Sequence, residues 1–359
     1  MKFFNLLLCL FLAGQTGQGQ SNYRVIGPVH QIGSSINTDF FIRSIEDRRD
    51  FRANLGIVNR GARKDLKRPL IPENGFFDSL LEQMNSWIQP EINAEPVVAK
   101  LKELYLWESQ GINTERGFIR LEMAFSGAVG QEEEAVTIVL SGEELNVANG
   151  HAPRLEAAFF RCLQAYNDRR KTVVSVSNTP QNTVEQKTGR AGIMAASNFL
   201  NLWKGELFPI SGNLRRKGIS YRYQLKRGGE EPEQFYYAVM KEGGLFIWAG
   251  QYTGTGAGKY YTRVLEQGRY LFMIDEISLN RESKEQAEVG QFSNTKVGVV
   301  IDMETGVPQI VDDELMKQLM QPYPALQEKY LFKDILKFAF QLTRVQNVIA
   351  EINRLEQDN

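Results

Sequence analysis

Few residues in this chain have the types and spacing that chemistry needs. The most suggestive run is the glycine-rich stretch 253–260, Thr-Gly-Thr-Gly-Ala-Gly-Lys-Tyr. A phosphate-binding P-loop needs a glycine where Thr253 stands and a serine or threonine where Tyr260 stands, and a helix should follow. Residues typical of strands flank this run instead. We therefore predict a hairpin loop and no nucleotide or other cofactor.

The chain has few residues that could bind a metal or act as a catalytic nucleophile. The chain has two histidines, His30 and His151, which lie far apart and have no cysteine or carboxylate pattern beside them. No Gly-x-Ser-x-Gly motif occurs. Asp275 and Glu276 are neighbours on a predicted strand and should point to opposite faces, which is a poor arrangement for paired acid catalysis. We predict that the protein is not an enzyme, and a hydrolase is only the third alternative.

Two groups of residues are candidates for binding. The first is a basic segment that is either a solvated loop or an anion-binding loop for cell-wall or lipopolysaccharide groups. It contains Arg60, Arg63, Lys64, Lys67 and Arg68. The second is an aromatic sheet that either binds a small molecule or a glycan or forms the core. Its candidate contacts are Tyr236, Trp248, Tyr252 and Tyr260.

The overall charge gives no reason to expect a nucleic-acid partner. The formal net charge is −1, with 42 basic and 43 acidic residues. Arginines and tyrosines interleave between Arg215 and Arg227, as in some single-strand binding surfaces, but glutamates follow directly at 230, 231 and 233. A strand surface of mixed charge explains this segment better.

The N-terminus has the pattern of a secretory signal peptide, which we assign to residues 1–20. Lys2 precedes an apolar run from Leu6 to Ala13, and small residues follow. This run is too short to span a bilayer, and no later segment is long enough. The alternative is a lipid anchor on Cys9, but leucines stand where a lipoprotein signal has small residues. We expect a periplasmic or otherwise exported envelope protein that does not span the membrane.

Removal of the signal would leave Cys162 as the only thiol, so no internal disulfide is expected. Cys162 shares a helical apolar face with Leu155, Phe159 and Tyr166. A lone cysteine in such a place is typically buried and inert.

The sequence indicates an α+β protein of two domains. In the first, 36–172, a strand at 40–45 precedes a helix near 77–88, which Asn74 should cap and Pro90 should end. Strands at 97–108, 118–125 and 135–140 and a helix at 153–167 follow. This βαβββα-like order predicts a two-layer α/β sandwich with helices on one face.

Residues 173–198 are polar and read as a linker. The second domain, 199–357, shows candidate strands at 219–226, 235–241, 245–249, 260–265, 270–275, 297–302 and 307–311. Glycine-containing turns separate them, which predicts an antiparallel meander or a partly closed barrel. Asp312 should cap a short helix, and a long C-terminal helix follows. The apolar stripe of that helix should pack on its own domain or associate with a second copy.

The run Ser44-Ile45-Glu46-Asp47-Arg48-Arg49, followed by Leu55-Gly56, a helix and a strand ending in Leu106-Trp107-Glu108, resembles the YajG-type envelope lipoproteins of Gram-negative bacteria. The resemblance covers 40–168 and implies an envelope location without implying catalytic residues. The second half resembles exported bacterial proteins of unknown role. Our leading hypothesis is a non-enzymatic interaction or scaffolding component that meets an envelope protein, and the alternative is a small-molecule or glycan-binding module.

Overall fold

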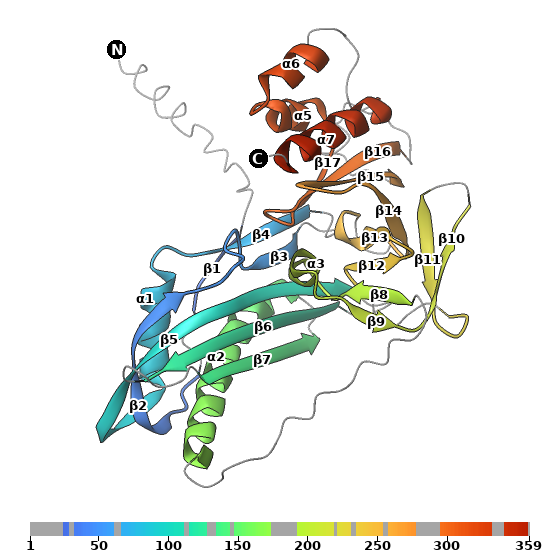
Figure 1. The fold of residues 1–359 in the computed structure, drawn as a ribbon. Coiled ribbons are helices and arrows are strands. Elements are labelled where there is room, and N and C mark those ends of the chain that lie inside the picture. The colour runs from blue at the N-terminus through green and yellow to red at the C-terminus, as the bar shows by residue number, and fades with distance from the viewer. Residues whose placement is uncertain are drawn as a thin grey trace, which may run out of the picture.

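The computed structural model describes residues 24–28, 32–60, 66–110, 115–127, 134–143, 147–173, 192–218, 221–230, 235–253, 258–277, 295–331 and 341–357. The predicted signal peptide and His30 lie outside these residues. The fold is α+β, as predicted: a mixed sheet and an antiparallel sheet carry helices, and the C-terminus is helical (Figure 1). Within the described residues, no helix is both long enough and apolar enough to cross a bilayer.

The first sheet is built around one long strand, β5 (Ile88–Gln110). Parallel to it lie β2 (Ile36–Asp47) and β3 (Gly56–Arg60), and β6 (Glu115–Ser126) lies antiparallel on its other side. The strand β7 (Glu134–Glu143) continues beyond β6. The strand β3 forms an antiparallel hairpin with β4 (Leu66–Pro72). The short strand β1 (Arg24–Ile26) pairs with β4 in parallel and forms the edge of the sheet.

Two helices cover one face of this sheet, as the first domain's apolar pattern predicts. They are α1 (Phe76–Ser86) and α2 (Val147–Val173), and Figure 1 shows α2 crossing behind β5, β6 and β7. Leu80 and Met84 of α1 and Phe159 and Cys162 of α2 meet inward residues of the strands in one core. Because side chains alternate along a strand, every second residue faces this core.

The predicted boundaries of α1 were wrong in two respects. Gly75, in a left-handed conformation with φ of 75°, precedes the helix, and no side chain caps it, so Asn74 is not the cap. Pro90 does not end the helix but lies in β5 opposite Thr38 of β2. Pairing between β5 and β6 begins only at Val98. Pro90 therefore has a neighbouring strand, β2, on one side only. At such an edge the nitrogen of a proline can face away from the neighbouring strand, and the ladder then loses no hydrogen bond.

The second sheet begins earlier than predicted. Part of the predicted linker, 173–198, is the strand β8 (Ile193–Ala196), which pairs with β12 (Ala238–Lys241) and β9 (Phe208–Ile210). The helix α3 (Phe199–Lys204) stands between β8 and β9. Four residues are too few for a periodic pattern, and only pairing with distant strands makes β8 recognisable.

The predicted antiparallel meander is confirmed from β12 onward. The strands β13 (Gly244–Trp248), β14 (Tyr261–Glu266), β15 (Tyr270–Ile277), β16 (Thr295–Asp302) and β17 (Pro308–Ile310) each pair with the one before. A hairpin of β10 (Asn213–Arg216) and β11 (Arg222–Lys226) joins the side of β14. Within the described residues the outermost strands, β9 and β17, do not meet, so the sheet does not close into a barrel.

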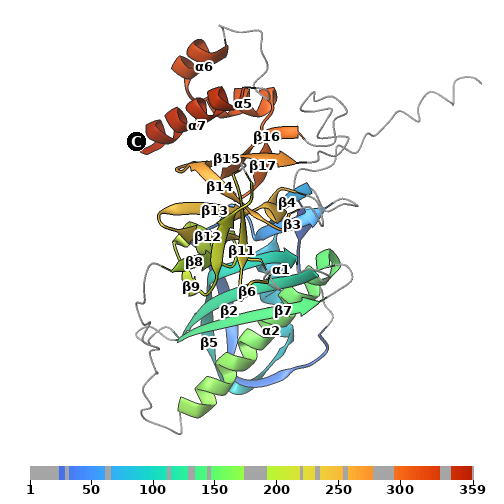
Figure 2. The same ribbon diagram turned by 90° about the vertical axis from the view of Figure 1, so that its right-hand side faces the viewer.

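Among the described residues, three helices lie at the C-terminal end, above β14 to β17 in Figure 2. They are α5 (Asp313–Met320), α6 (Pro324–Leu331) and α7 (Leu342–Gln357). Asp312 caps α5 as predicted, with Leu315 N donating to its carboxylate at 2.7 Å. The apolar stripe of α7, including Val345 and Ile349, is fully buried against β15 and β16. The described part of the predicted helix therefore packs on its own domain, whereas residues 332–340 lie outside the described part of the chain, and association with a second copy stays a prediction.

The two predicted domains share a core. Phe51 and Tyr105 come from the first half of the chain but pack in the same cluster as Phe199 and Tyr237 of the second. The Asn54 side-chain amide also donates to the Thr305 carbonyl at 2.8 Å.

Candidate functional site

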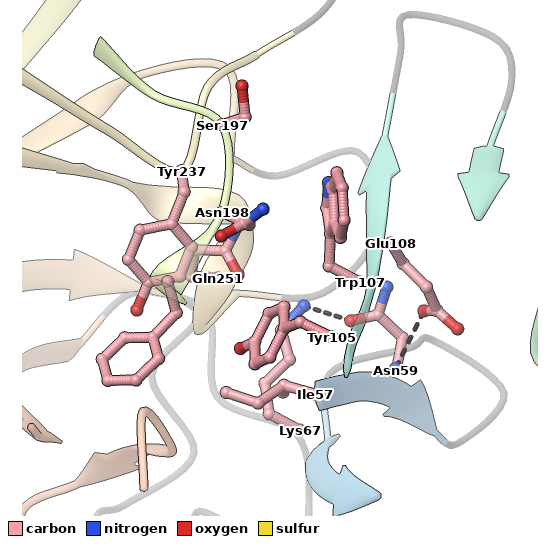
Figure 3. Close-up of a pocket in the computed structure, with 11 residues that line it drawn as sticks. Ile57, Asn59, Lys67, Tyr105, Trp107, Glu108, Ser197, Asn198, Tyr237 and Gln251 are labelled. Carbon is pink, nitrogen blue, oxygen red and sulfur yellow. Dashed lines mark hydrogen bonds between the residues drawn. The ribbon is translucent and has the colours of Figure 1, made fainter. Parts of the chain in front are cut away.

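A small pocket lies at this junction of the two sheets (Figure 3). Its cavity volume is about 20 Å³, which is space for a water molecule or one small polar group and not for a sugar ring. The lining residues come from β3, β4 and β5 on one side and from the segments around β8, α3 and β12 on the other: Ile57, Asn59, Lys67, Tyr105, Trp107, Glu108, Ser197, Asn198, Phe199, Tyr237 and Gln251.

The wall from the first sheet is aromatic because of strand alternation. Leu104 and Leu106 face the helices, so Tyr105 and Trp107 lie on the opposite face, toward the second sheet. Trp107 stacks on Phe118 of β6, with 5.0 Å between ring centroids and 8° between ring planes. These contacts hold the wall in one arrangement.

The wall from the second sheet carries an unusual hydroxyl group. Tyr237 is 5% exposed, and its hydroxyl has no hydrogen-bond partner among the described residues. Burial raises the pKa of Tyr237 far above its usual range. Burial, together with the neighbouring Tyr237, also raises the pKa of Tyr105. Both phenols therefore stay protonated at neutral pH and remain hydrogen-bond donors.

A chain of polar side chains runs from the pocket into the first sheet. Lys67 donates to the Asn59 side-chain oxygen, and Asn59 N donates to Glu108 Oε2 at 2.9 Å. The other oxygen of Glu108 lies 2.8 Å from His151 Nε2, and Arg154 lies 3.2 Å from His151 Nδ1. Arginine only donates, so Nδ1 accepts and Nε2 carries the proton that Glu108 accepts.

This histidine and carboxylate pair was missed in the sequence because 43 residues separate its members. Arg154 occupies Nδ1, the ring nitrogen of His151 that would otherwise be open to accept a proton. His151 is also 1% exposed. Within the described residues, no three His, Cys, Asp or Glu side chains gather as a metal site.

The structure places three residues of the basic segment on strands, and its two alternatives, a solvated loop and an anion-binding loop, stay predictions. Lys67 is buried in β4 and lines the pocket, and Arg68 lies on the same strand opposite Val58. Arg60 ends β3, and Arg63 and Lys64 lie outside the described residues. Three of the five cations, Arg60, Lys67 and Arg68, thus lie on the strands of the β3–β4 hairpin.

Most of the rings of the aromatic sheet form the core, which is one of the two alternatives that the sequence left open. Trp248 is buried, stacks on Phe235 and donates to the Gly258 carbonyl at 2.5 Å. Tyr252 and Tyr260 are buried, and their hydroxyls reach Asp275 Oδ2 at 3.0 and 2.7 Å. They satisfy a buried carboxylate and present no surface to a glycan.

The remaining members of these clusters are also explained by internal contacts. Tyr236 is half-buried under the Arg227 guanidinium, 5.3 Å from its ring centroid. Asp275 also accepts from Arg222 Nε at 2.7 Å. A buried charge is stable only when paired in this way, so the Asp275 cluster supports the fold.

A second candidate surface is the open edge of the first sheet at β7. Its only partner among the described strands is β6. Residues 135–142, Ala-Val-Thr-Ile-Val-Leu-Ser-Gly, contain neither charge nor proline. Val139 is 59% exposed. The Ala135 carbonyl accepts from Arg169 at 2.7 Å and so points away from β6. Thr137 and Val139 share this direction, because the outward groups alternate along an antiparallel strand.

Every other described edge carries a protective feature. Strands β1, β9 and β17 have three residues each, β9 and β17 also contain Pro209 and Pro308, and β10 carries two arginines. On the open side of β2, the Asn85 side chain bonds to both Ile42 N and Ile42 O, at 3.0 and 2.8 Å. Such features block the addition of another strand. The long neutral edge of β7 is the exception.

Comparisons with known proteins give one match. Residues 217–335 match a family of unknown function (DUF6563), which covers the second sheet from β11 to α6. No curated protein and no solved structure matches the chain significantly. The match includes neither the pocket residues of the first sheet nor β7, and the resemblance to YajG-type lipoproteins stays a prediction.

Proposed function

We propose that the protein is an exported, non-enzymatic component of the bacterial cell envelope. It binds a partner protein when an extended strand of that partner pairs with the open edge of β7. The signal-like sequence of residues 1–20 supports export. The observation that carries the binding role is the contrast between the protected edges and the open edge of β7.

The geometry of β7 suits strand addition. Outward N–H and C=O groups at Thr137 and Val139 supply main-chain hydrogen bonds, and the exposed Val139 supplies an apolar contact. The opposite face of the strand is held by the core through Val136, Ile138 and Leu140. A rigid edge of this kind accepts an extended segment without rearranging.

A partner other than a second copy fits this edge better. Positions 134 and 143, at the two ends of β7, are both glutamate. If the β7 strands of two copies paired antiparallel in full register, Glu134 of each copy would lie opposite Glu143 of the other. Like charges directly opposite each other destabilise a pair of strands. An extended partner segment with a neutral centre and neutral or basic ends avoids this repulsion.

The test is affinity recovery of the tagged mature protein from gently crosslinked envelopes, followed by mass spectrometry. Val139→Pro removes the outward N–H without touching the β6 ladder, and Val139→Lys places a charge at the edge. Val139→Thr is the matched control, because it keeps a neutral, branched side chain and the N–H. We expect one envelope protein to be recovered with the wild type and the control, and at least about tenfold less with the other two variants.

Equal recovery with all four proteins, or no specific protein with any of them, would contradict the proposal. Size-exclusion chromatography of the same four proteins measures their oligomeric state and tests whether the occupant is a second copy. A wild-type dimer that Val139→Lys converts to monomer would show that a second copy is the occupant. Recovery of the tagged protein from the cytoplasm alone would contradict export.

A further inference from the structure

The hairpin of β10 and β11 carries a concentration of positive charge that the β7 proposal does not use. Its fifteen residues, 213–227, include six arginines and lysines and no carboxylate. The whole chain has 42 basic and 43 acidic residues, so the two signs of charge are separated at this place. Figure 1 shows the hairpin at the right-hand side of the second sheet, and β11 is the only partner of β10 among the described strands.

Strand alternation turns one face of this hairpin toward solvent. Leu214 and Leu225 pair with each other and are buried in the core, so the residues next to them along each strand point outward. The outward residues of the paired strands are two amides and two cations: Asn213, Arg215, Gln224 and Lys226. A surface of mixed charge was predicted for this segment, but this face carries no acid.

Contacts within the fold explain only some of the six cations. Arg222 pairs with the buried Asp275 at 2.7 Å, and Arg227 donates to a backbone carbonyl at 3.2 Å. Arg215 and Lys226, in contrast, make no hydrogen bond or ion pair with another residue in the described part of the chain. They are diagonal neighbours on the outward face, where two like charges repel each other. Folding alone therefore gives no reason for this pair.

We propose that this hairpin docks on the anionic surface of a lipid bilayer. Arg215 and Lys226 lie on the outward face, whereas Arg216 is exposed and points to the other side of β10. No single small anion can contact side chains that diverge in this way, but the phosphate groups of neighbouring lipids can. Each basic residue beside an anionic bilayer strengthens binding about fivefold, so a few of them suffice for a weak, reversible attachment.

The orientation of the hairpin is fixed by its ion pair with the body of the protein. The guanidinium of Arg222 also lies 4.5 Å from the centre of the Tyr260 ring, which is buried in the second sheet. The cations are thus presented from a held ribbon. Because β7 belongs to the first sheet, lipid docking does not depend on strand addition there.

The test is co-sedimentation of the full mature protein with vesicles of phosphatidylcholine, either alone or with about 30% phosphatidylglycerol. We expect binding to the anionic vesicles only, and a steep fall of that binding between about 0.05 and 0.5 M NaCl. The double variant Arg215→Gln, Lys226→Gln should bind about 25-fold more weakly, because two charges of about fivefold each are lost. The exchange Arg215→Lys, Lys226→Arg keeps both charges and should bind like the wild type.

A matched control removes two other exposed cations and so changes the net charge by the same amount. Arg43→Gln, Arg161→Gln lies on β2 and α2 and should weaken binding less than about twofold. Urea midpoints should be the same for all these proteins, since none of the four side chains has a described partner.

Equal binding to neutral and anionic vesicles, or binding to neither, would overturn the proposal. Equal losses in the hairpin variant and in the control would overturn it too, because the attraction would then follow overall charge. Binding to soluble polyphosphate but not to vesicles would show that the occupant is not a lipid surface.

Discussion

The side chain of Asn85 holds the backbone of Ile42 at both of its polar groups: Ile42 N donates to Oδ1 at 3.0 Å, and Nδ2 donates to Ile42 O at 2.8 Å. Asn85 lies near the end of α1, and Ile42 is in the middle of β2. An amide side chain thus takes the place of a neighbouring strand at this point of the edge.

Asn85→Ala should destabilise the protein by about 1–3 kcal/mol, because it leaves two backbone groups of Ile42 without their partner. Urea denaturation measures this change. The control Glu82→Ala removes an exposed side chain from the same helix and should change stability by less than about 0.5 kcal/mol. Equal effects of the two variants would show that the Asn85 bonds contribute little.

Glu103 is a charged contact between the two halves of the chain. Its buried carboxylate lies 2.6 Å from Lys204 Nζ and 2.9 Å from Arg120 Nε. Glu103→Gln should cost about 2–3 kcal/mol, less than for a fully buried pair, since both cations reach solvent. Glu206 is 43% exposed at 3.7 and 3.9 Å from the same cations, so the control Glu206→Gln should cost less than about 1 kcal/mol. A larger loss for Glu206→Gln would reverse this ranking.

Cys162 should be unreactive in the folded protein. It is fully buried in α2, and burial raises the pKa of its thiol from 9.0 to about 12. At a given pH below 9 this leaves about one thousandth of the usual thiolate, which is the reactive form. Labelling of the mature protein with a thiol reagent should therefore proceed only through unfolding and accelerate with urea. Rapid labelling at a rate independent of urea would contradict the burial of Cys162.

Asp47 should make folding sensitive to acid. Burial on its own raises the pKa of Asp47, but the hydrogen bond and positive charge of Arg49, at 2.8 Å, outweigh it and the pKa is lowered. The folded pKa thus lies below the usual 3.8, so the contribution of Asp47 is present above pH 3.8 and is lost as the pH falls through the lowered pKa.

The variant Asp47→Asn should therefore be less stable than the wild type at pH 7, and the difference should shrink below about pH 4. Urea denaturation at several pH values follows this difference. Glu46→Gln is the control, because Glu46 pairs with the exposed Arg48, and it should have a small effect throughout. A difference for Asp47→Asn that grows as the pH falls would contradict the assignment.

Much of the fold could be predicted because its elements are locally periodic. Alternation from Phe118 to Phe125 predicted β6, and the three- and four-residue spacing of Leu80 and Met84 predicted α1. The candidate binding residues were predicted poorly. Trp248, Tyr252 and Tyr260 are suited both to a ligand surface and to a core, and their sequence positions are the same in either case.

Local order along the chain, then, was determined by the sequence itself: side-chain periodicity, turn glycines and the cap at Asp312 depend on residues within a few positions of one another. Contacts between distant segments were decided only by the tertiary structure. It brought Glu108 to His151, Tyr105 to Tyr237 and Asn85 to Ile42, and among the described strands it left one side of β7 unpaired. Such contacts depend on which sheets and helices pack together, and no local pattern of side chains encodes that choice.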